Sequence, residues 1–378
     1  MQPFVPQSLP LQEVQWEELI ASIGRANRAL ARFDGVLAGL TNPNLLFSPL
    51  MTQEAVLSSR IEGTTAGVND VLRFEAGEPP HEQNLQQDIY EIINYRNALN
   101  YALAALQAQP FSRKLLLELH TVLLKSGRGQ DKEPGRIRIE QNWIGVHGRP
   151  IEEAFHVPPE AHLLPQFIDN WLEYYRGESP DPLVQLAVIH AQFEILHPFM
   201  DGNGRIGRLL VPLFLYEKRI LSEPVFYLSA YLEAHRDEYE QGLRVLSGLD
   251  SWNQWILFFL RAIESQAEEN AAKARDIQTL YESLKRTILD LTRSQYAVPL
   301  LDAMFAKPIF RSSELFDRPE MPSQPAVTHM LNQLKEAGVL TLVREAAGRR
   351  PQVLMLEKLL SIAEGREVRL PAVAQVPA

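Results

Sequence analysis

Apolar residues recur every three or four positions along most of this 378-residue chain. This spacing is typical of helices that bury one face, and it constrains the fold more than any other feature of the sequence. Segments rich in β-branched and aromatic residues are few, so we expect a mainly all-α protein of two or three domains. Helices are predicted over residues 13–40, 52–61, 85–107, 112–124, 159–176, 182–196, 205–218, 234–246 and 252–291, with a loop at 41–44.

The C-terminal third has a different organisation. The predicted helix 252–291 becomes charge-rich after Glu264, which is typical of a connecting helix, here 264–291. Residues 292–365 follow as helices and one hairpin, an order that resembles a winged helix. The last stretch, 366–378, has two prolines and little to bury, so we expect a loose tail.

The formal charge of −10 argues against a protein that coats nucleic acid or an anionic membrane. Residues 291–365 hold nine basic and eight acidic side chains, a net charge of +1, which leaves −11 for the remainder. The chain has no cysteine, which excludes disulfides, thiolate nucleophiles and cysteine metal sites. The start, MQPFVPQSLP, lacks the pattern of a secretion signal, and the apolar runs are too short for a membrane span. We therefore expect a cytoplasmic protein.

Residues 197–208 read HPFMDGNGRIGR and lie between two predicted helices. Pro198 cannot continue the first helix, so His197 is presented at its end. Gly202 and Gly204 allow unusual backbone dihedral angles that expose successive N–H groups, and the next helix begins there. Exposed N–H groups at the positive end of a helix dipole predict an anion site that fits a polyphosphate.

The charged residues of this segment extend the prediction. Arg205 and Arg208 lie on one side of the helix start and add cationic groups. Asp201 is a poor neighbour for phosphate unless a cation stands between them, so it predicts a Mg²⁺ site. Without the histidine and the arginines, the same residues would indicate only a tight turn.

The segment resembles the signature loop of the Fic family, and matches its pattern H-P-F-x-[D/E]-G-N-G-R-x-x-R at every specified position. The resemblance covers about 7–261 and implies the Fic fold, a helical core with a β-hairpin called the flap. It implies a protein adenylyltransferase that moves AMP from ATP to Ser, Thr or Tyr hydroxyls, with His197 as general base and Asp201 as Mg²⁺ ligand. It further implies that nucleotide is held by Gly202, Asn203, Gly204, Arg205, Ile206, Gly207 and Arg208.

Two further regions are read with the help of this resemblance. Arg138–Val157 has β-branched and aromatic residues around two glycines, which predicts a hairpin at the position of the flap. An ordinary surface hairpin is the alternative. The flap residues expected near the target or the nucleotide are Trp143, Ile144 and Phe155.

Tyr239, with Tyr231 as second choice, is the candidate for stacking on adenine. A plain core role is an equal alternative.

Ser58 to Gly63 fits the S/T-x-x-x-E-G/N inhibitory helix of the family. Glu62 falls in the last helical turn, where a negative charge opposes the helix dipole and favours a cationic partner. The resemblance offers Arg208, so that the pair would occupy the γ-phosphate site; a solvated glutamate is the alternative. The expected domains are an N-terminal region 1–80 with the inhibitory helix 53–63, and a Fic core 81–263.

Several functions stay open at this point. Removal of AMP from a modified protein, with Glu62 positioning the water, is the chief enzymatic alternative, and another nucleotide or a phosphocholine donor is a second. Transfer of a terminal phosphate, as in Doc-type toxins, is disfavoured because GNGR is intact. A DNA-binding regulator is a minor alternative, since 323–337 carries one lysine and no arginine. The partners expected are a target protein with a hydroxyl residue, the chain itself through self-modification, and a second copy.

Overall fold

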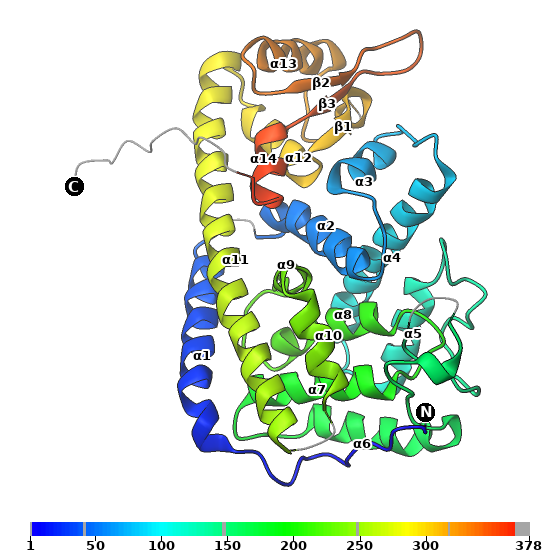
Figure 1. The fold of residues 1–378 in the computed structure, drawn as a ribbon. Coiled ribbons are helices and arrows are strands. Elements are labelled where there is room, and N and C mark those ends of the chain that lie inside the picture. Colours follow the sequence, from blue (N-terminus) through cyan, green and yellow to red (C-terminus); the bar gives the residue numbers. More distant parts are fainter. Residues whose placement is uncertain (1, 41–42, 146–148, 247–248, 317, 367–378) are drawn as a thin grey trace.

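The computed structural model describes residues 2–40, 43–145, 149–246, 249–316 and 318–366. Helices dominate, so the predicted fold class is confirmed (Figure 1). The long helices are α1 (Trp16–Ala38), α2 (Pro43–Ile61), α4 (Gln83–Leu106), α5 (Arg113–Leu123), α6 (Leu164–Arg176), α7 (Pro182–Leu196), α8 (Asn203–Glu217), α11 (Leu249–Thr292) and α13 (Gln324–Glu336). The shorter ones are α3 (Val68–Glu75), α9 (Ser229–Ala234), α10 (Arg236–Arg244), α12 (Ala297–Ala306) and α14 (Glu357–Ala363).

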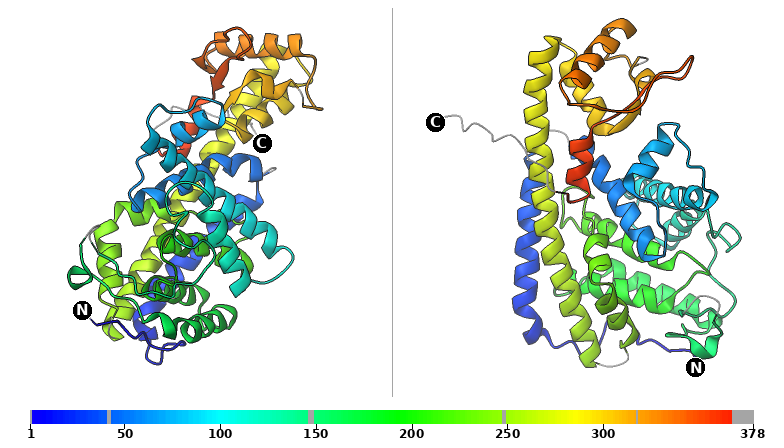
Figure 2. Two further views of the ribbon diagram at one scale, coloured as in Figure 1. Left: turned by 90° about the vertical axis from the view of Figure 1, so that its right-hand side faces the viewer. Right: turned by 45° about the horizontal axis from the view of Figure 1, so that its top comes forward.

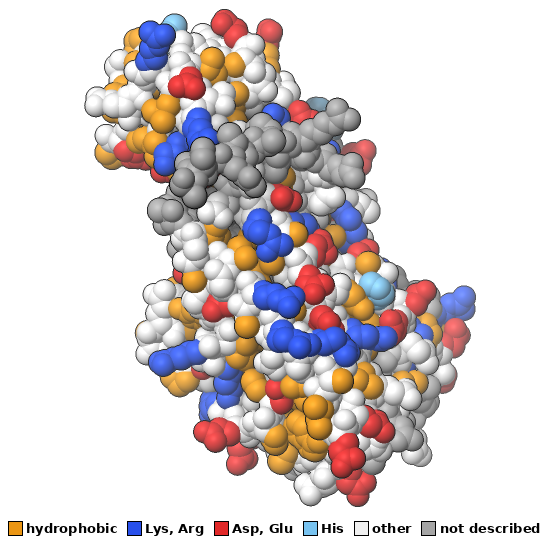
Figure 3. All heavy atoms as spheres, turned by 90° about the vertical axis from the view of Figure 1, so that its left-hand side faces the viewer, with side chains coloured by type: hydrophobic (Ala, Val, Ile, Leu, Met, Phe, Trp, Pro, Cys, Tyr) orange, Lys and Arg blue, Asp and Glu red, His pale blue; other side chains and the backbone are white. Residues whose placement is uncertain are grey.

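Helix α11 has 44 residues and runs along almost the whole length of the molecule. Helix α1 lies along the first half of α11 (Figure 2). The buried side chains of α1 include Leu30 and Phe33. On the face formed by these two helices, basic and acidic side chains lie among one another (Figure 3), as in the ion pair of Arg25 with Glu264 at 3.1 Å. No helix of the described residues is long and apolar enough to cross a membrane.

Helices α7 and α8 lie at the centre of the larger part of the molecule. Pro182 occupies the first turn of α7, and the Asp181 side chain accepts hydrogen bonds from the N–H groups of Leu183 (2.9 Å) and Val184 (3.0 Å). This cap satisfies backbone donors that a helix start leaves free. From Leu183 to Leu196 every side chain of α7 is buried, so the helix is fixed on all sides.

Helix α2 is longer than the sequence predicts. It begins at Pro43, inside the segment expected to be a loop, because proline is well tolerated in the first turn of a helix. It ends before Gly63, whose φ of 98° terminates the helix. The helix packs between α4, α9 and the C-terminal helices α12 and α14, and Ser48 Oγ donates to the carbonyl of Ala306 at 3.0 Å.

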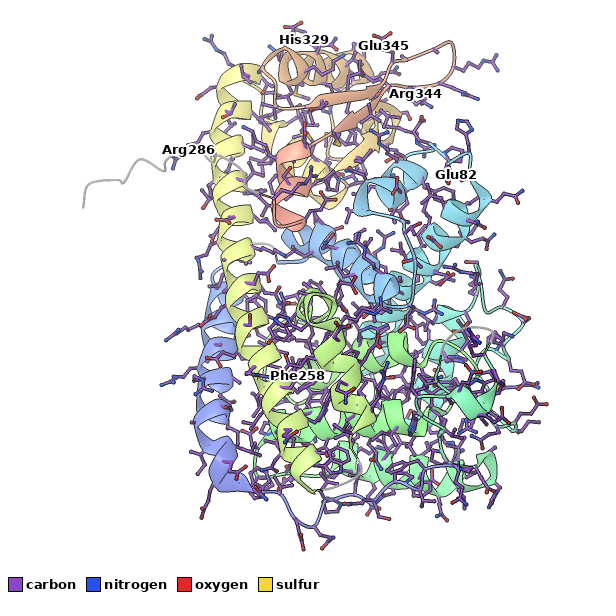
Figure 4. All side chains as sticks on the ribbon, viewed as in Figure 1. Glu82, Phe258, Arg286, His329, Arg344 and Glu345 are labelled. Atoms are coloured by element: carbon purple, nitrogen blue, oxygen red, sulfur yellow. The ribbon has the colours of Figure 1, made fainter. Side chains whose placement is uncertain are left out.

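The C-terminal unit contains more sheet than expected. Strands β1 (Ile309–Arg311), β2 (Thr341–Arg344) and β3 (Val353–Met355) form an antiparallel sheet in the order β1-β3-β2. The predicted hairpin is β2–β3, and β1 and α14 were not predicted because each is too short to show a clear period. Arg344 of β2, labelled in Figure 4, pairs with Glu78, which follows α3 in the sequence. The winged-helix character of this unit stays a prediction.

Two other elements differ from expectation. The helix expected at 234–246 is shorter: α10 begins at Arg236 and ends at Arg244, and His235, whose φ of −118° and ψ of 38° are not helical, separates it from α9. Among its described residues, the predicted flap hairpin has one β-bridge, Ile144 with His156, and a 3₁₀ helix at Ile151–Glu153. Pro150 and the prolines at 158 and 159 lack the N–H that a longer ladder needs.

Candidate active site

His197 stands at the end of α7 with φ 43° and ψ 58°, in the left-handed region that residues other than glycine seldom adopt. Its Nδ1 lies 3.4 Å from the carbonyl of Glu194. Because a carbonyl only accepts, Nδ1 carries the proton and Nε2 is left as the basic nitrogen. Burial lowers the pKa of His197 to about 4, so the imidazole is neutral at pH 7.

The loop after His197 is closed by its own side chains. Asn203 Oδ1 accepts from the N–H of Phe199 at 2.9 Å, and its Nδ2 donates to the carbonyl of Phe199 at 2.8 Å. Phe199 is fully buried and stacks on His120 with 3.8 Å between ring centroids. Gly202 follows with φ 77°, which brings the start of α8 back towards His197. Asn203 therefore shapes the loop, and its predicted contact with nucleotide stays a prediction.

The side chain of Arg208 contacts the end of α2 beside the start of α8. Arg208 is 2% exposed; its Nη2 donates to Glu62 Oε1 at 2.6 Å and to the carbonyl of Ser58 at 2.9 Å, and its Nε donates to Ser58 Oγ at 2.9 Å. A Cβ on Gly204 would collide with the Glu62 carboxylate. The carboxylate thus lies against the helix start at which the sequence predicts an anion. The structure therefore brings together four of the predicted site residues, namely Ser58, Glu62, Gly204 and Arg208.

The charges of this pair stabilise each other. Burial alone would raise the pKa of Glu62, but the Arg208 guanidinium outweighs it and the pKa lies below its usual value. Burial opposes the charge of Arg208, while Glu62 raises the pKa of the guanidinium. The Glu62 side chain is 39% exposed, so solvent screens part of the attraction.

A cavity of about 510 Å³ lies next to this pair. Its wall is formed by the end of α2, the flap, the end of α7, the start of α8 and helix α10. His197, Gly204 and Arg208 lie at one end, and Ile144 and Phe155 of the flap at another. Trp143 is 43% exposed beside the wall, and its Nε1 donates to the carbonyl of Arg149 at 3.3 Å. Two of the three predicted flap residues therefore face the cavity.

The Asp201 side chain is 37% exposed, and its Oδ1 accepts from the N–H of Gly202 at 2.5 Å. His120 supports its backbone: Nδ1 of His120 accepts from the N–H of Gly135 (2.8 Å), so its Nε2–H donates to the Asp201 carbonyl (2.9 Å). No group of three or more metal-ligating side chains occurs among the described residues. A single accessible carboxylate is enough for Mg²⁺ in sites where substrate phosphates and several waters supply the other ligands of the ion. The residues present fit a Mg²⁺ ion that binds in this way.

Arg205 has partners other than a phosphate. It is 3% exposed and pairs with Glu91 Oε2 at 3.0 Å and Asp201 Oδ1 at 3.4 Å. Arg128 joins the same network through Glu91 (2.5 Å) and Asp88 (2.6 Å). The structure places Arg205 beneath the loop, where it orients Asp201, and outside the cavity wall of the described residues. Its predicted grip on phosphate stays a prediction.

Tyr239 of α10 also lines the cavity. Nδ1–H of His190 donates to the carbonyl of Gly207 at 3.0 Å, so the Tyr239 hydroxyl donates to its Nε2, also at 3.0 Å. Tyr239 is 3% exposed, and Phe258 of α11, labelled in Figure 4, packs near its ring. Tyr231 stacks on His235 at 4.0 Å, away from the cavity wall formed by the described residues. The adenine-stacking role stays a prediction for both tyrosines; Ile206, also predicted at the nucleotide, is fully buried.

Several residues of this site were missed in the sequence. Four of them, Glu91, His120, Arg138 and Asn142, bind backbone carbonyls or charged side chains of the protein rather than an expected ligand. Glu194 lines the cavity, burial raises its pKa to about 7, and its Oε1 has no hydrogen-bond partner among the described residues. A histidine or glutamate within a leucine-rich helix looks like any buried polar residue. The residues missed are Glu91, His120, Arg138, Asn142 and Glu194.

Comparison with known proteins gives two matching family models. The model "Fic/DOC family N-terminal" matches residues 20–104, and the model "Fic/DOC family" matches residues 110–215. Together these ranges span just over half of the chain. A probable protein adenylyltransferase from Aquifex aeolicus is 33% identical over 93 residues, which are 24% of this chain and 29% of that protein. The protein adenylyltransferase Fic from Drosophila ananassae is 34% identical over 126 residues, 33% of this chain and 24% of that protein. The matches thus cover about a quarter of the length of these relatives.

Solved structures show the same fold. A Fic family protein from Desulfovibrio desulfuricans has a TM-score of 0.54 and 22% identity, with 94% of this chain and 98% of that chain covered. Fic-1 from C. elegans (residues 134–508) has a TM-score of 0.54 and 21% identity, with 71% of this chain and 76% of that chain covered. The first likeness extends over the C-terminal unit as well as the catalytic part.

Proposed function

Because this chain belongs to the Fic/DOC family, we propose that it transfers AMP from ATP to hydroxyl side chains (Ser, Thr or Tyr) of a target protein. The observation that carries this proposal is the position of His197. Its basic Nε2 makes no hydrogen bond to a described residue, and the imidazole lines the same cavity as Gly204 and Arg208 at the start of α8. A base beside an anion site is the arrangement that attack of a hydroxyl on a phosphate needs.

The transfer follows from this arrangement in one displacement. His197 Nε2 takes the proton of the target hydroxyl, and the hydroxyl oxygen forms a bond to the α-phosphorus. The bond between the α-phosphorus and the α,β-bridging oxygen breaks, and pyrophosphate leaves with that electron pair. The N–H groups at the start of α8 and the Arg208 guanidinium stabilise the charge on the phosphates. The protein contributes mainly position and charge, as in phosphoryl transfer generally.

Mg²⁺ is the ion that the accessible carboxylate of Asp201 would hold. When bound, the ion neutralises negative charge on the α- and β-phosphates. The chain's own part is to hold the Asp201 carboxylate in place, through the His120 hydrogen bond to its backbone and the Arg205 contact to its side chain.

The inhibitory role of Glu62 is part of the proposal. Its carboxylate pairs with Arg208 and lies against Gly204, so it competes with the γ-phosphate for the same guanidinium and the same helix start. Ser58 accepts two further hydrogen bonds from Arg208, from Nε and Nη2, and fixes the guanidinium in the inhibited position. ATP would then bind in a form that does not react.

We also propose a cytoplasmic location and a homodimer. The proposed domain bounds are 1–80, 81–263, 264–291, 292–365 and 366–378. DNA binding by the C-terminal unit has little support, because Lys335 is the one basic residue of α13 and its Nζ donates to Gln352. A protein partner suits this unit better.

Labelled ATP tests the proposed reaction. The chain and its Glu62→Gly variant are incubated with Mg²⁺, cell lysate and ATP labelled at either the α- or the γ-phosphate. We expect protein to acquire the α-label only, and more of it with the variant. Acquisition of the γ-label would indicate phosphate transfer. A protein that stays unlabelled with both forms of the chain would contradict the proposal and favour a regulator that only binds nucleotide.

The reverse reaction is the second candidate, and one observation favours it. Glu62 lines the same cavity as His197 and is 39% exposed, so it could also orient a water molecule. Protein that carries α-label is therefore isolated and returned to the unmodified chain. Release of AMP that stops in Glu62→Gln would identify removal as the main activity.

Asp201→Ala should lower the transfer rate and weaken its dependence on Mg²⁺, because the substitution removes the one accessible carboxylate of the loop. The measurement is the initial rate over a series of Mg²⁺ concentrations. Asp131→Ala, which removes an exposed carboxylate of the same region, serves as the control and should behave as the parent. Full turnover in excess chelator would refute the metal assignment.

A further inference from the structure

Arg138 lies where the chain enters the flap, and its side chain is 1% exposed. Its backbone N–H donates to the carbonyl of Pro198 and its Nε to the carbonyl of His197, both at 3.0 Å. Its Nη1 donates to the carbonyl of Glu140 at 3.0 Å, and its Nη2 to the carbonyl of Pro159 at 2.6 Å. One guanidinium therefore joins three segments, namely the signature loop and both stems of the flap.

This cation is buried among carbonyl groups. Burial lowers the pKa of Arg138 to about 10, and no carboxylate of the described residues acts on it. A buried charge without a counter-ion destabilises a folded protein unless hydrogen bonds replace its hydration. The carbonyl dipoles supply those bonds here, but a neutral side chain would avoid the cost altogether. Fold stability alone therefore does not explain an arginine at this position.

The contact with His197 has a direct consequence for the imidazole. A histidine in the left-handed region is strained and keeps this conformation only when its surroundings hold it. Its carbonyl accepts from Arg138 Nε, and from Asn142 Nδ2 at a longer 3.5 Å. These bonds fix the peptide that carries the ring, and so the direction in which Nε2 points.

The charge of Arg138 acts on the same ring. Burial is the main cause of the low pKa of His197. The hydrogen bond to the Glu194 carbonyl and the charge of Glu62 raise this pKa, and His156 of the flap and then Arg138 lower it further. The other charged or titratable groups in the wall of this cavity are Glu194, Arg208, Arg236, Tyr239, Glu240 and Arg244. A permanent cation behind the ring favours the neutral imidazole that a general base requires.

We propose that Arg138 is the positioning residue of the transfer reaction: it fixes the His197 backbone relative to both stems of the flap. Its charge adds to the effect of burial in favouring the neutral imidazole. The base and the flap, whose residues are expected near the target or the nucleotide, are then held by one side chain. This inference rests on the proposed function, since it assigns His197 the role of base.

Two variants separate the two effects of Arg138. Arg138→Gln removes the charge and shortens the side chain, so we expect kcat to fall about 10- to 100-fold and the acid limb of the kcat/KM profile to move to higher pH. Arg138→Lys keeps the charge but not the planar fork, so kcat should fall while the acid limb stays near that of the parent. The KM for ATP should change little in either variant.

The matched control is Arg136→Gln, which makes the same substitution at an exposed arginine two residues earlier. Its kcat and pH profile should equal those of the parent. All variants are compared in the Glu62→Gly background, where transfer is expected to be fast enough to measure.

Titration of the His197 ring by NMR, without ATP or target, provides a readout that does not depend on transfer. We expect the His197 pKa to rise in Arg138→Gln and to stay low in Arg138→Lys and Arg136→Gln. If no transfer is found in any form, this titration still decides whether Arg138 acts on His197, so the inference and the proposed function fail separately.

A folded Arg138→Gln with parental kcat and an unchanged His197 titration would overturn the inference. If Arg138→Gln does not fold, Arg138→Lys decides: a fall in kcat at an unchanged acid limb supports the inference, and parental kcat overturns it. All rates are divided by the folded fraction of each variant, so that a loss of active protein is not counted as a fall in kcat. A folded Arg138→Gln whose pH profile does not move, and whose corrected kcat is parental, is only less stable, and this result would also overturn the inference.

Discussion

His197→Ala should reduce transfer of the α-label by about 10²–10⁴-fold or more, because the substitution removes the imidazole base beside the anion site. Among the described residues the ring has one long hydrogen bond, 3.4 Å to the carbonyl of Glu194, so its loss leaves the loop bonds of Asn203 and Phe199 intact. ATP binding and folding should therefore remain close to those of the parent. The measurement is the initial labelling rate in the Glu62→Gly background, with ATP affinity determined by calorimetry.

His162→Ala is the control for this experiment, since the His162 side chain is 71% exposed on the short helix before α6. It should label as fast as the parent. Transfer by His197→Ala at the parental rate would remove this histidine from the mechanism, and loss of ATP binding together with transfer would show that the ring belongs to the nucleotide site instead.

Glu62→Gly should increase self-labelling and target labelling about ten- to a hundredfold, because it frees Arg208 for the γ-phosphate. A hydrogen bond to a charged group contributes about 1.5–3 kcal/mol, and about 1.4 kcal/mol corresponds to a factor of ten. The Glu62 side chain is 39% exposed, so screening places the expected gain in the lower part of that range. The labelling rate at saturating ATP is the measurement.

Three variants sharpen this test. Glu62→Asp should release inhibition only partly, since the carboxylate is withdrawn by one methylene group. Glu62→Gly combined with Arg208→Ala should be poorly active, because the freed guanidinium is then absent. Glu336→Gln removes an exposed glutamate at the end of α13 and should label as the parent does. Labelling by Glu62→Gly no faster than by the parent would show that inhibition does not reside in Ser58–Gly63.

The signature loop could be predicted from the sequence because its chemistry is contiguous. His197 and Arg208 lie within twelve residues of sequence. The positive φ of Gly202 could be expected because glycine has no side chain to oppose it. The partner of Arg208 lies 146 residues away, and no rule of spacing leads from one to the other. Only the resemblance to a known inhibitory motif suggested Glu62.

Arg138 and His120 could not be predicted for a different reason. Both act by donating to backbone carbonyls, those of His197 and Asp201, and every residue has a carbonyl. Because any residue type can accept such a hydrogen bond, the sequence at the accepting position does not indicate it. Arg205 shows the converse: an arginine at a helix start suggests phosphate, and nothing in the local sequence indicates its ion pair with the buried Glu91 of α4 at 3.0 Å. Tertiary contact decides which of several suitable partners a side chain meets.

Two elements were not predicted correctly, and the reasons differ: one strand is too short, and the start of one helix depends on tertiary packing. Strand β1 has three residues, Ile309–Arg311, which is too few to show alternation, yet its register with β3 fixes the sheet. The start of α2 at Pro43 follows from the packing of this helix against the C-terminal unit, which local propensity does not contain.

Helix α2 belongs to the same polypeptide as the site it covers, and α12 and α14 hold it from the far side. The contact between Glu62 and Arg208 is therefore governed by a unimolecular equilibrium. Its occupancy is the same in a dilute assay as in a crowded compartment, unlike that of an inhibitor supplied by a second protein. A change in expression level would leave the active fraction of the chain constant, and only a molecule that binds the chain, or a chemical change within it, would alter that fraction.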